Sequence, residues 1–229
     1  IEREGDKIAL IMLGGVNYYT GQFYNLEEIA KASHNAGACV GYDLAHAVGN
    51  VELKLHEWGV DFGVWCSYKY LNSGAGGVAG AFVHEKHIGN KEIPRLAGWW
   101  GHDKQTRFLM EPGFNPIPSA ESWQLSNAPV FSMAPHMASL KIFDDIGMEA
   151  LCRKRDLLTG YLEFLINEVN EKMNIITPRD KAQRGCQLSI FTGNNGKAIH
   201  DNLTKDGFIS DWRNPNVIRV APVPLYNSF

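Results

Sequence analysis

Residues 25–67 read NLEEIAKASHNAGACVGYDLAHAVGNVELKLHEWGVDFGVWCS and carry the strongest structural pattern of the chain. The apolar residues of the first part recur at intervals of three and four, which predicts a helix that ends near Gly37. The uniformly apolar runs at 38–43 and 60–67 predict two strands. A further helical segment is expected between them, near residues 53–58. Helices and strands therefore alternate along this part of the chain.

Apolar runs on either side of these residues predict two more strands, at 7–13 and 77–85. Strands that alternate with helices are typical of a sheet with parallel neighbours and right-handed crossovers. Strands that are buried on both faces of such a sheet are uniformly apolar, as these are. The sequence therefore predicts an α/β fold, with a mostly parallel sheet and flanking helices.

The alternation of predicted helices and strands is absent between residues 91 and 129, where proline, glycine and tryptophan are frequent. A loop of this length is usually functional or lies at an interface. After it, a long helical stretch reaches residue 170 and is interrupted around Gly147. Short strands and one helix then predict a small α+β domain; the strands are expected at 173–178, 184–193, 206–210 and 216–222, and the helix near 195–206.

The expected domain organisation follows from these patterns. We expect part of a large domain at residues 1–130, connecting helices at 131–169 and a small α+β domain at 170–229. The chain begins without methionine and ends without a closing element, so we expect it to be a piece of a longer protein.

The composition argues against some classes of function. A net charge of −3 gives no basic surface, so a nucleic-acid partner is not expected. The sequence has no apolar run of 18 residues, so no membrane span is expected. The four cysteines are widely spaced, which favours reduced thiols in a cytoplasmic protein.

Three residues that can do chemistry follow predicted strands, at the edge where α/β sheets bind their ligands. Asp43 closes the strand at 38–43, His46 follows it, and Lys69 lies between two tyrosines after the next strand. Each has an ordinary structural explanation, as a helix N-cap, a hydrogen-bonded histidine and a solvated lysine. Together they fit pyridoxal phosphate, which needs an amine for a Schiff base and a carboxylate beside its pyridine nitrogen.

Five motifs narrow this interpretation: YDLAHAVGN, CSYKYLNSGAGG, GWWGH, QLSNAP and NPNVIRVAPVPLYNSF. With them, the chain resembles the fold-type I, class V aminotransferase group of pyridoxal phosphate enzymes, and more narrowly the kynureninase family, of the animal type. The resemblance covers most of the chain and corresponds to the C-terminal half or so of the family's length. Most class V relatives have Asp-Ala-x-Gln where this chain has Asp-Leu-Ala-His, and Ser-x-His-Lys where it has Ser-Tyr-Lys.

The resemblance implies roles for the residues around the cofactor. Lys69 would form the Schiff base and move the α-proton, and Asp43 would pair with the pyridinium nitrogen. His46 would lie against the cofactor near its phenolic oxygen. Tyr68 would bind the phosphate and serve as an acid or base for the carbon released by cleavage.

Other implied roles concern a second subunit and the substrate. Trp99 and Asn127 would reach a cofactor site across the interface of a homodimer. Asn127, with Ser126, would also read the aromatic ring of the substrate, and Arg219 would clamp its carboxylate by a bidentate pair. Two alternatives stay open: one of Trp99 and Trp100 could only pack, and Arg219 could lie on the solvent face of a strand.

The implied reaction is the hydrolysis of L-kynurenine or 3-hydroxy-L-kynurenine to anthranilate or 3-hydroxyanthranilate and L-alanine, in tryptophan catabolism towards NAD precursors. Asn127 suggests the 3-hydroxylated substrate. One alternative is a cysteine desulfurase, but Cys152 lies in a predicted helix and Cys186 in a predicted strand, whereas that chemistry needs a cysteine on a mobile loop. A second alternative is an inactive fragment, because the rest of the family's length should carry the aromatic residue that stacks on the cofactor and most phosphate ligands.

Overall fold

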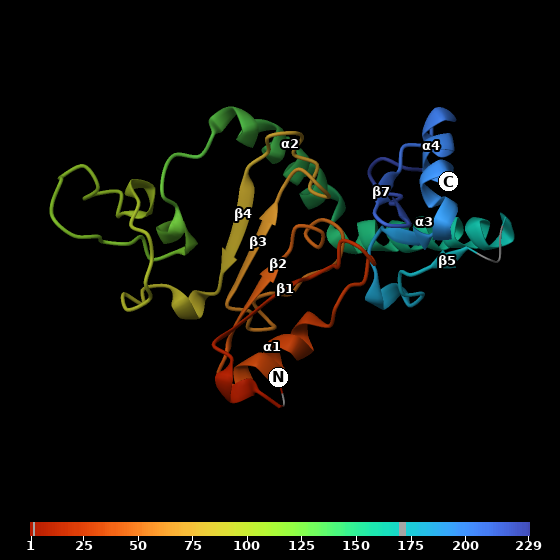
Figure 1. Ribbon diagram of the computed structural model, residues 1–229. Coiled ribbons are helices and arrows are strands. Elements are labelled where there is room, and N and C mark those ends of the chain that lie inside the picture. Colours follow the sequence, from red (N-terminus) through yellow and green to blue (C-terminus); the bar gives the residue numbers. More distant parts are fainter. Residues whose placement is uncertain (2, 170–172) are drawn as a thin grey trace. The chain divides into compact units, whose positions relative to one another are not determined.

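The computed structural model describes residues 1, 3–169 and 173–229 (Figure 1). The chain divides into two compact units, each built from separate parts of the sequence. The first unit comprises Ile1–Leu13, Leu26–Asp43 and Lys54–Ser139, and the second comprises Gly14–Asn25, Leu44–Leu53 and Leu140–Phe229.

The first unit is built on a four-stranded sheet in the order β1-β2-β3-β4 (Figure 1). Its strands are β1 (Leu10–Gly14), β2 (Cys39–Asp43), β3 (Phe62–Cys66) and β4 (Ala79–Val83). The inner strands β2 and β3 run parallel, with Asp43 opposite Val64. Val40 and Tyr42 of β2 are fully buried, as expected for an inner strand of an α/β sheet. The predicted α/β class is therefore confirmed.

The direction of β4 differs from the parallel neighbours that the alternating pattern predicts. β4 runs antiparallel to β3, and Cys66 pairs with Ala79. The connection at residues 67–78 contains turns and no helix. A parallel strand needs a crossover of about a dozen residues or more, usually helical, whereas a turn returns the chain along the strand it has just left. The sheet is therefore mixed.

The helix α1 (Leu26–Asn35) lies where the sequence predicts it. It ends in a Schellman motif, in which Gly37 N–H donates to the His34 carbonyl at 2.9 Å and Ala38 N–H donates to the Ser33 carbonyl at 3.0 Å. Gly37 has a φ of +78°, which confirms its predicted position after the helix.

The helical segment predicted near residues 53–58 is wrong. These residues form turns, with Trp58 N–H bonded to the Lys54 carbonyl at 2.9 Å. Gly59 follows with a φ of +67°, and β3 starts at Phe62. The segment therefore has room for one helical turn only, which is too short to propagate as a helix.

The irregular stretch between residues 91 and 129 is confirmed. It contains the short 3₁₀ helices η3 (Trp99–Gly101) and η4 (Ala120–Trp123). Two others lie elsewhere in the first unit, η1 (Gly5–Lys7) and η2 (Glu85–His87). The Arg95 guanidinium stacks 4.1 Å from the ring centroid of Trp123, which holds the start of the stretch against η4.

Two long helices follow, α2 (Val130–Ile146) and α3 (Met148–Val169), and the break at Gly147 is as predicted. Gly147 has a φ of +78°. The predicted helical stretch reaches residue 170, which lies outside the described residues. α2 begins in the first unit and ends in the second, and α3 belongs to the second.

The second unit contains a four-stranded sheet in the order β5-β6-β8-β7, in which every neighbouring pair is antiparallel. Its remaining elements are β5 (Asn174–Ile175), η5 (Lys181–Gln183), β6 (Leu188–Phe191), η6 (Gly193–Asn195), α4 (Gly196–Lys205), β7 (Asp211–Arg213) and β8 (Val217–Val220). The predicted strand at 206–210 is wrong, because Gly207, at φ +88°, caps α4 and delays the strand to Asp211.

The domain boundaries at 1–130, 131–169 and 170–229 stay a prediction, and the last of them starts at a residue outside those described. Across residues 1, 3–169 and 173–229, none of the helices is long and apolar enough to cross a membrane.

Candidate active site

Asp43 and Lys69 lie at one edge of the first sheet. Asp43 is the last residue of β2, and its neighbour β3 runs parallel to β2 and leads directly into the turn that carries Lys69. Parallel strands end at the same edge, which is where open α/β sheets bind their ligands. The carboxylate and the amine that the sequence singles out are therefore on the same edge.

Tyr68 and Lys69 are neighbours on the turn, and their side chains are partly exposed to solvent. The side chain of Tyr68 is 53% exposed, and the Lys69 ammonium lies 5.9 Å from its ring centroid. A hydrogen bond with the Cys66 thiol, together with its charge, raises the pKa of the Tyr68 phenol. A phenol is protonated at neutral pH already at its ordinary pKa of about 10, so Tyr68 can donate a hydrogen bond to an anion.

His46 and Arg219 belong to the second unit. The His46 carbonyl accepts a hydrogen bond from Asn50 Nδ2 at 2.9 Å, in the turn that follows β2. Arg219 Nε and Nη2 each lie 2.6 Å from Asp211 Oδ2, and Nη1 donates to the Tyr18 carbonyl. The Arg219 side chain is only 11% exposed, so its guanidinium is held in a fixed direction rather than solvated.

Gly98 and Leu125, the chain neighbours of Trp99 and Ser126, approach each other closely in the irregular part of the first unit. A Cβ atom on Gly98 would lie 2.2 Å from the Leu125 Cα atom, so the two backbones touch at these residues. Trp99 is 55% exposed and packs edge-on against Phe108, with ring centroids 5.4 Å apart. This close approach places Trp99 beside the segment that carries the predicted substrate residues.

Trp100 differs from its neighbour. The Arg107 guanidinium stacks 4.7 Å from the Trp100 ring centroid and donates to the Trp100 carbonyl at 3.0 Å. Both tryptophans thus have an aromatic or cationic neighbour within the unit, and Trp99 is the more exposed of the two.

Substitution of Gly98 by alanine should separate the Trp99 segment from Leu125. The new Cβ would meet backbone atoms, which cannot rotate away, so we expect a loss of about 2 kcal/mol or more. Limited proteolysis should then cut residues 91–129 faster. Gly113→Ala is the control, because nothing lies within 4 Å of a Cβ there, although its φ of +99° gives it a separate conformational cost. Equal proteolysis rates in both variants would contradict the close-approach argument.

Asn50 supports the turn that carries His46, and the sequence argument misses it. Its side chain donates to the His46 carbonyl and its Oδ1 accepts from Cys186 N–H at 2.8 Å. Its own carbonyl accepts from Arg155 Nη1 at 2.9 Å. Asn50 is buried, and it ties the His46 turn to α3 and to the segment before β6. The signal available in the sequence was only that it closes the motif YDLAHAVGN.

Replacement of Asn50 by alanine should destabilise the second unit by about 2–3 kcal/mol, because two buried partners lose their hydrogen bonds. Urea unfolding followed by circular dichroism measures the loss. Asn50→Asp keeps an acceptor for Cys186 N–H but loses the donor to His46. The stability of Asn50→Asp should therefore fall between that of the alanine variant and that of the original chain. An alanine variant as stable as the original chain would contradict the role of Asn50 in holding these segments together.

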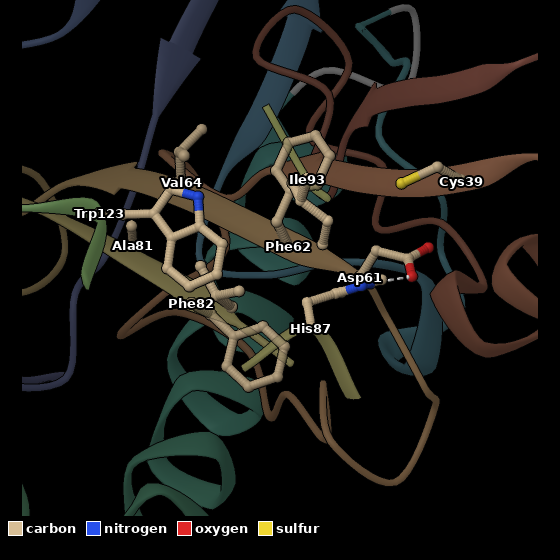
Figure 2. A pocket seen from close by; sticks show the side chains of 10 residues that line it. Cys39, Asp61, Phe62, Val64, Ala81, Phe82, His87, Ile93 and Trp123 are labelled. Carbon is tan, nitrogen blue, oxygen red and sulfur yellow. Dashed lines mark hydrogen bonds and ion pairs between the residues drawn. The ribbon is translucent and has the colours of Figure 1, made fainter. Parts of the chain in front are cut away.

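An apolar pocket of about 490 Å³ lies in the first unit (Figure 2). Figure 2 shows the rings of Phe62, Phe82 and Trp123 around it, with Asp61 and His87 joined at one side. Among the described residues, its lining includes none of the predicted site residues. No cluster of possible metal ligands occurs in the part of the chain that the structure describes.

The fold matches those of known pyridoxal phosphate enzymes. An apo cysteine desulfurase from Thermococcus onnurineus superposes with a TM-score of 0.79 over 99% of this chain and 58% of its own, at 17% identity. A C-DES mutant with glycine covalently linked to the PLP cofactor superposes with a TM-score of 0.77 over 96% and 57%, also at 17% identity. The chain thus has the fold of the fold-type I, class V group.

The sequence comparisons are more specific. A family model described as the kynureninase C-terminal domain matches residues 151–229. Kynureninases from Flavobacterium psychrophilum and Myxococcus xanthus are 53% and 55% identical to the whole chain. The chain belongs to the kynureninase family, and it spans 55% and 54% of the length of these two relatives. Both are bacterial and do not support the narrower prediction of an animal type.

Proposed function

We propose that this chain serves the pyridoxal phosphate-dependent hydrolysis of L-kynurenine or 3-hydroxy-L-kynurenine to anthranilate or 3-hydroxyanthranilate and L-alanine. The observation that carries this proposal is the identity to kynureninases along the whole chain, combined with Asp43 and Lys69 at one sheet edge. Because the chain spans about half the length of these relatives, the activity is proposed for the site that their full length completes.

The residues at the carboxyl edge fit pyridoxal phosphate. When bound, this cofactor supplies an electron sink for the bonds at the substrate's α-carbon. Lys69 would hold the cofactor covalently and move the α-proton, and Asp43 would keep the pyridine nitrogen protonated. His46 would lie near the phenolic oxygen. Tyr68, whose phenol stays protonated, would donate to the phosphate and return a proton to the carbon released by cleavage.

The remaining residues would act on the substrate and the second subunit. Arg219 would bind the substrate carboxylate. In the structure its guanidinium pairs with the carboxylate of Asp211, which shows the same kind of partner. Trp99 and Asn127 would reach the cofactor site of the other subunit in a homodimer, and Ser126 with Asn127 would read the aromatic ring. We further propose a cytoplasmic enzyme of tryptophan catabolism that prefers the 3-hydroxylated substrate.

The cysteine desulfurase alternative is weaker, because that reaction needs a reactive thiolate. Burial raises the pKa of the Cys186 thiol to about 12 and that of Cys39 to about 11, the latter with help from Asp61. Burial likewise raises the pKa of Cys152, in α3. The likeness to desulfurases, at 17% identity, concerns the fold alone.

The test is to incubate the 229-residue chain with pyridoxal phosphate and either 3-hydroxykynurenine or cysteine, and to follow the fluorescence of hydroxyanthranilate, the release of alanine and the release of sulfide. Equal amounts of hydroxyanthranilate and alanine support the proposal. Sulfide from cysteine, without hydroxyanthranilate, would favour the desulfurase alternative. A reducible cofactor adduct without turnover would mean that this chain alone is an inactive piece.

A further inference from the structure

The turn that carries Lys69 is closed by a buried pair of serines. Ser67 and Ser73 are almost wholly inaccessible to solvent, although both lie in a loop. Their hydroxyl oxygens are 2.7 Å apart, and Ser67 Oγ also makes a short hydrogen bond to the Val78 carbonyl. Ser73 N–H donates to the Ser67 carbonyl at 3.2 Å. Residues 67–73 therefore form a closed loop around Lys69.

The direction of the bonds follows from the acceptors. The Val78 carbonyl can only accept, so the Ser67 hydroxyl proton is used there. Ser73 must then donate its hydroxyl proton to Ser67 Oγ. Removal of the Ser67 hydroxyl leaves the Ser73 hydroxyl proton and the Val78 carbonyl without this partner, whereas removal of the Ser73 hydroxyl takes from Ser67 Oγ the hydrogen bond that it accepts.

Gly77 is required by the same pair. A Cβ atom at this position would lie 1.9 Å from Ser73 Oγ and 2.9 Å from Ser67 Oγ. Gly74 and Gly76 differ, because both have positive φ values and nothing lies within 4 Å of a Cβ there. Gly77 is therefore needed for space, whereas the other two are needed for backbone conformation.

The turn is also fixed on its other side. Asn72 N–H donates to the Lys69 carbonyl at 3.1 Å, and Asn72 itself adopts a φ of 58°, which is uncommon for a residue other than glycine. Ser139 of α2 donates to the Leu71 carbonyl at 2.5 Å. The backbone of Lys69 is thus held between the serine pair and α2, within the first unit.

We propose that Ser67, Ser73 and Gly77 are positioning residues that set the direction of the Lys69 side chain toward the cofactor. This inference rests on the proposed function of Lys69 and assigns these three residues no contact with the reacting atoms. The hydroxyls fix the turn, and a fixed turn limits where the Lys69 amine can reach. Reaction of a held amine depends steeply on its placement.

The test uses the 229-residue chain and the variants Ser67→Ala, Ser73→Ala and Gly77→Ala. Each protein is mixed with pyridoxal phosphate and reduced with borohydride, and the label on Lys69 is compared with that on exposed Lys104 by peptide mass mapping. The ratio of the two labels should fall about fivefold or more in each variant, because a buried hydroxyl partner is lost or displaced. Ser73→Cys, which keeps a weak donor, should recover part of the ratio.

Hydrogen exchange of residues 67–73 provides a readout that needs no cofactor, and it should accelerate about tenfold in Ser73→Ala. Ser33→Ala is the matched control, because it also removes a buried hydroxyl, which donates to the Ile29 carbonyl inside α1. The inference is overturned if Ser73→Ala matches Ser33→Ala in both exchange and labelling. If the original chain shows no preference for Lys69, this chain alone does not form the cofactor site, and the exchange rates alone decide whether the serine pair holds the turn.

Discussion

Replacement of Lys69 by methionine should abolish the adduct that borohydride fixes between the chain and pyridoxal phosphate, and with it the visible absorbance. An amine held at the cofactor site reacts as an intramolecular partner, so we expect its removal to lower labelling by more than about 100-fold. Methionine keeps the length and apolar stem of lysine, so the turn after β3 should keep its fold. Absorbance spectra and peptide mapping of the reduced protein measure the loss.

Lys104→Met is the control for the Lys69 substitution. Lys104 is exposed, whereas Lys69 is partly buried, and it forms a surface pair with Glu121 at 3.2 Å in the irregular part of the same unit. Its replacement should leave the absorbance unchanged. If Lys69→Met still gave the adduct at the level of the original chain, the cofactor would be bound elsewhere or through another lysine, and the assignment of Lys69 would be wrong.

The sequence predicts the placement of Asp43 and Lys69 well, and the reason is physical. Asp43 closes one apolar run and Lys69 follows another, and both runs are the strands β2 and β3 that the sequence predicts. Because β2 and β3 are parallel, their ends must share one edge. These inferences depend on the local pattern of apolar residues and on the general geometry of parallel strands, and neither requires knowledge of contacts between distant residues.

The parts that the sequence does not predict depend on contacts between distant residues. The turn at 67–78 reverses the chain into β4, and nothing in its composition separates a tight return from a loop before a parallel strand. Asn50 gains its role from Cys186 and Arg155, more than 100 residues away, as the separations of 136 and 105 show. Asp61 likewise gains its role from contacts that the sequence does not show. In the sequence it is an ordinary polar residue at the start of an apolar run.

Replacement of Asp61 by asparagine should cause the largest loss of stability, about 3 kcal/mol, because the buried Val40 N–H and three partly exposed side chains lose a charged acceptor. The carboxylate accepts Val40 N–H at 2.7 Å and His34 Nε2 at 2.9 Å on one oxygen, and Lys86 and His87 lie 2.7 Å from the other. Its side chain is 6% exposed. Chemical unfolding of both proteins at pH 7 measures the difference.

The contribution of Asp61 should depend on pH in one direction. Burial alone would raise the pKa of this carboxyl, but hydrogen bonds from Lys86, Val40 N–H, His34 and His87 outweigh burial and hold the pKa well below its usual range. A carboxyl whose pKa is lowered in the folded state stabilises that state fully above the unfolded pKa of about 3.9. That contribution is lost as the pH falls below this value toward the folded pKa.

The dependence of stability on pH therefore separates the contribution of the Asp61 charge from that of its shape. The original chain should lose stability steeply as the pH falls below about 4, whereas Asp61→Asn should show a flatter acid limb from a lower starting point. Glu4→Gln removes an exposed carboxylate paired with Lys7 and should cost less than about 1 kcal/mol. Parallel acid limbs in the original chain and in Asp61→Asn would mean that the carboxylate contributes by shape rather than charge.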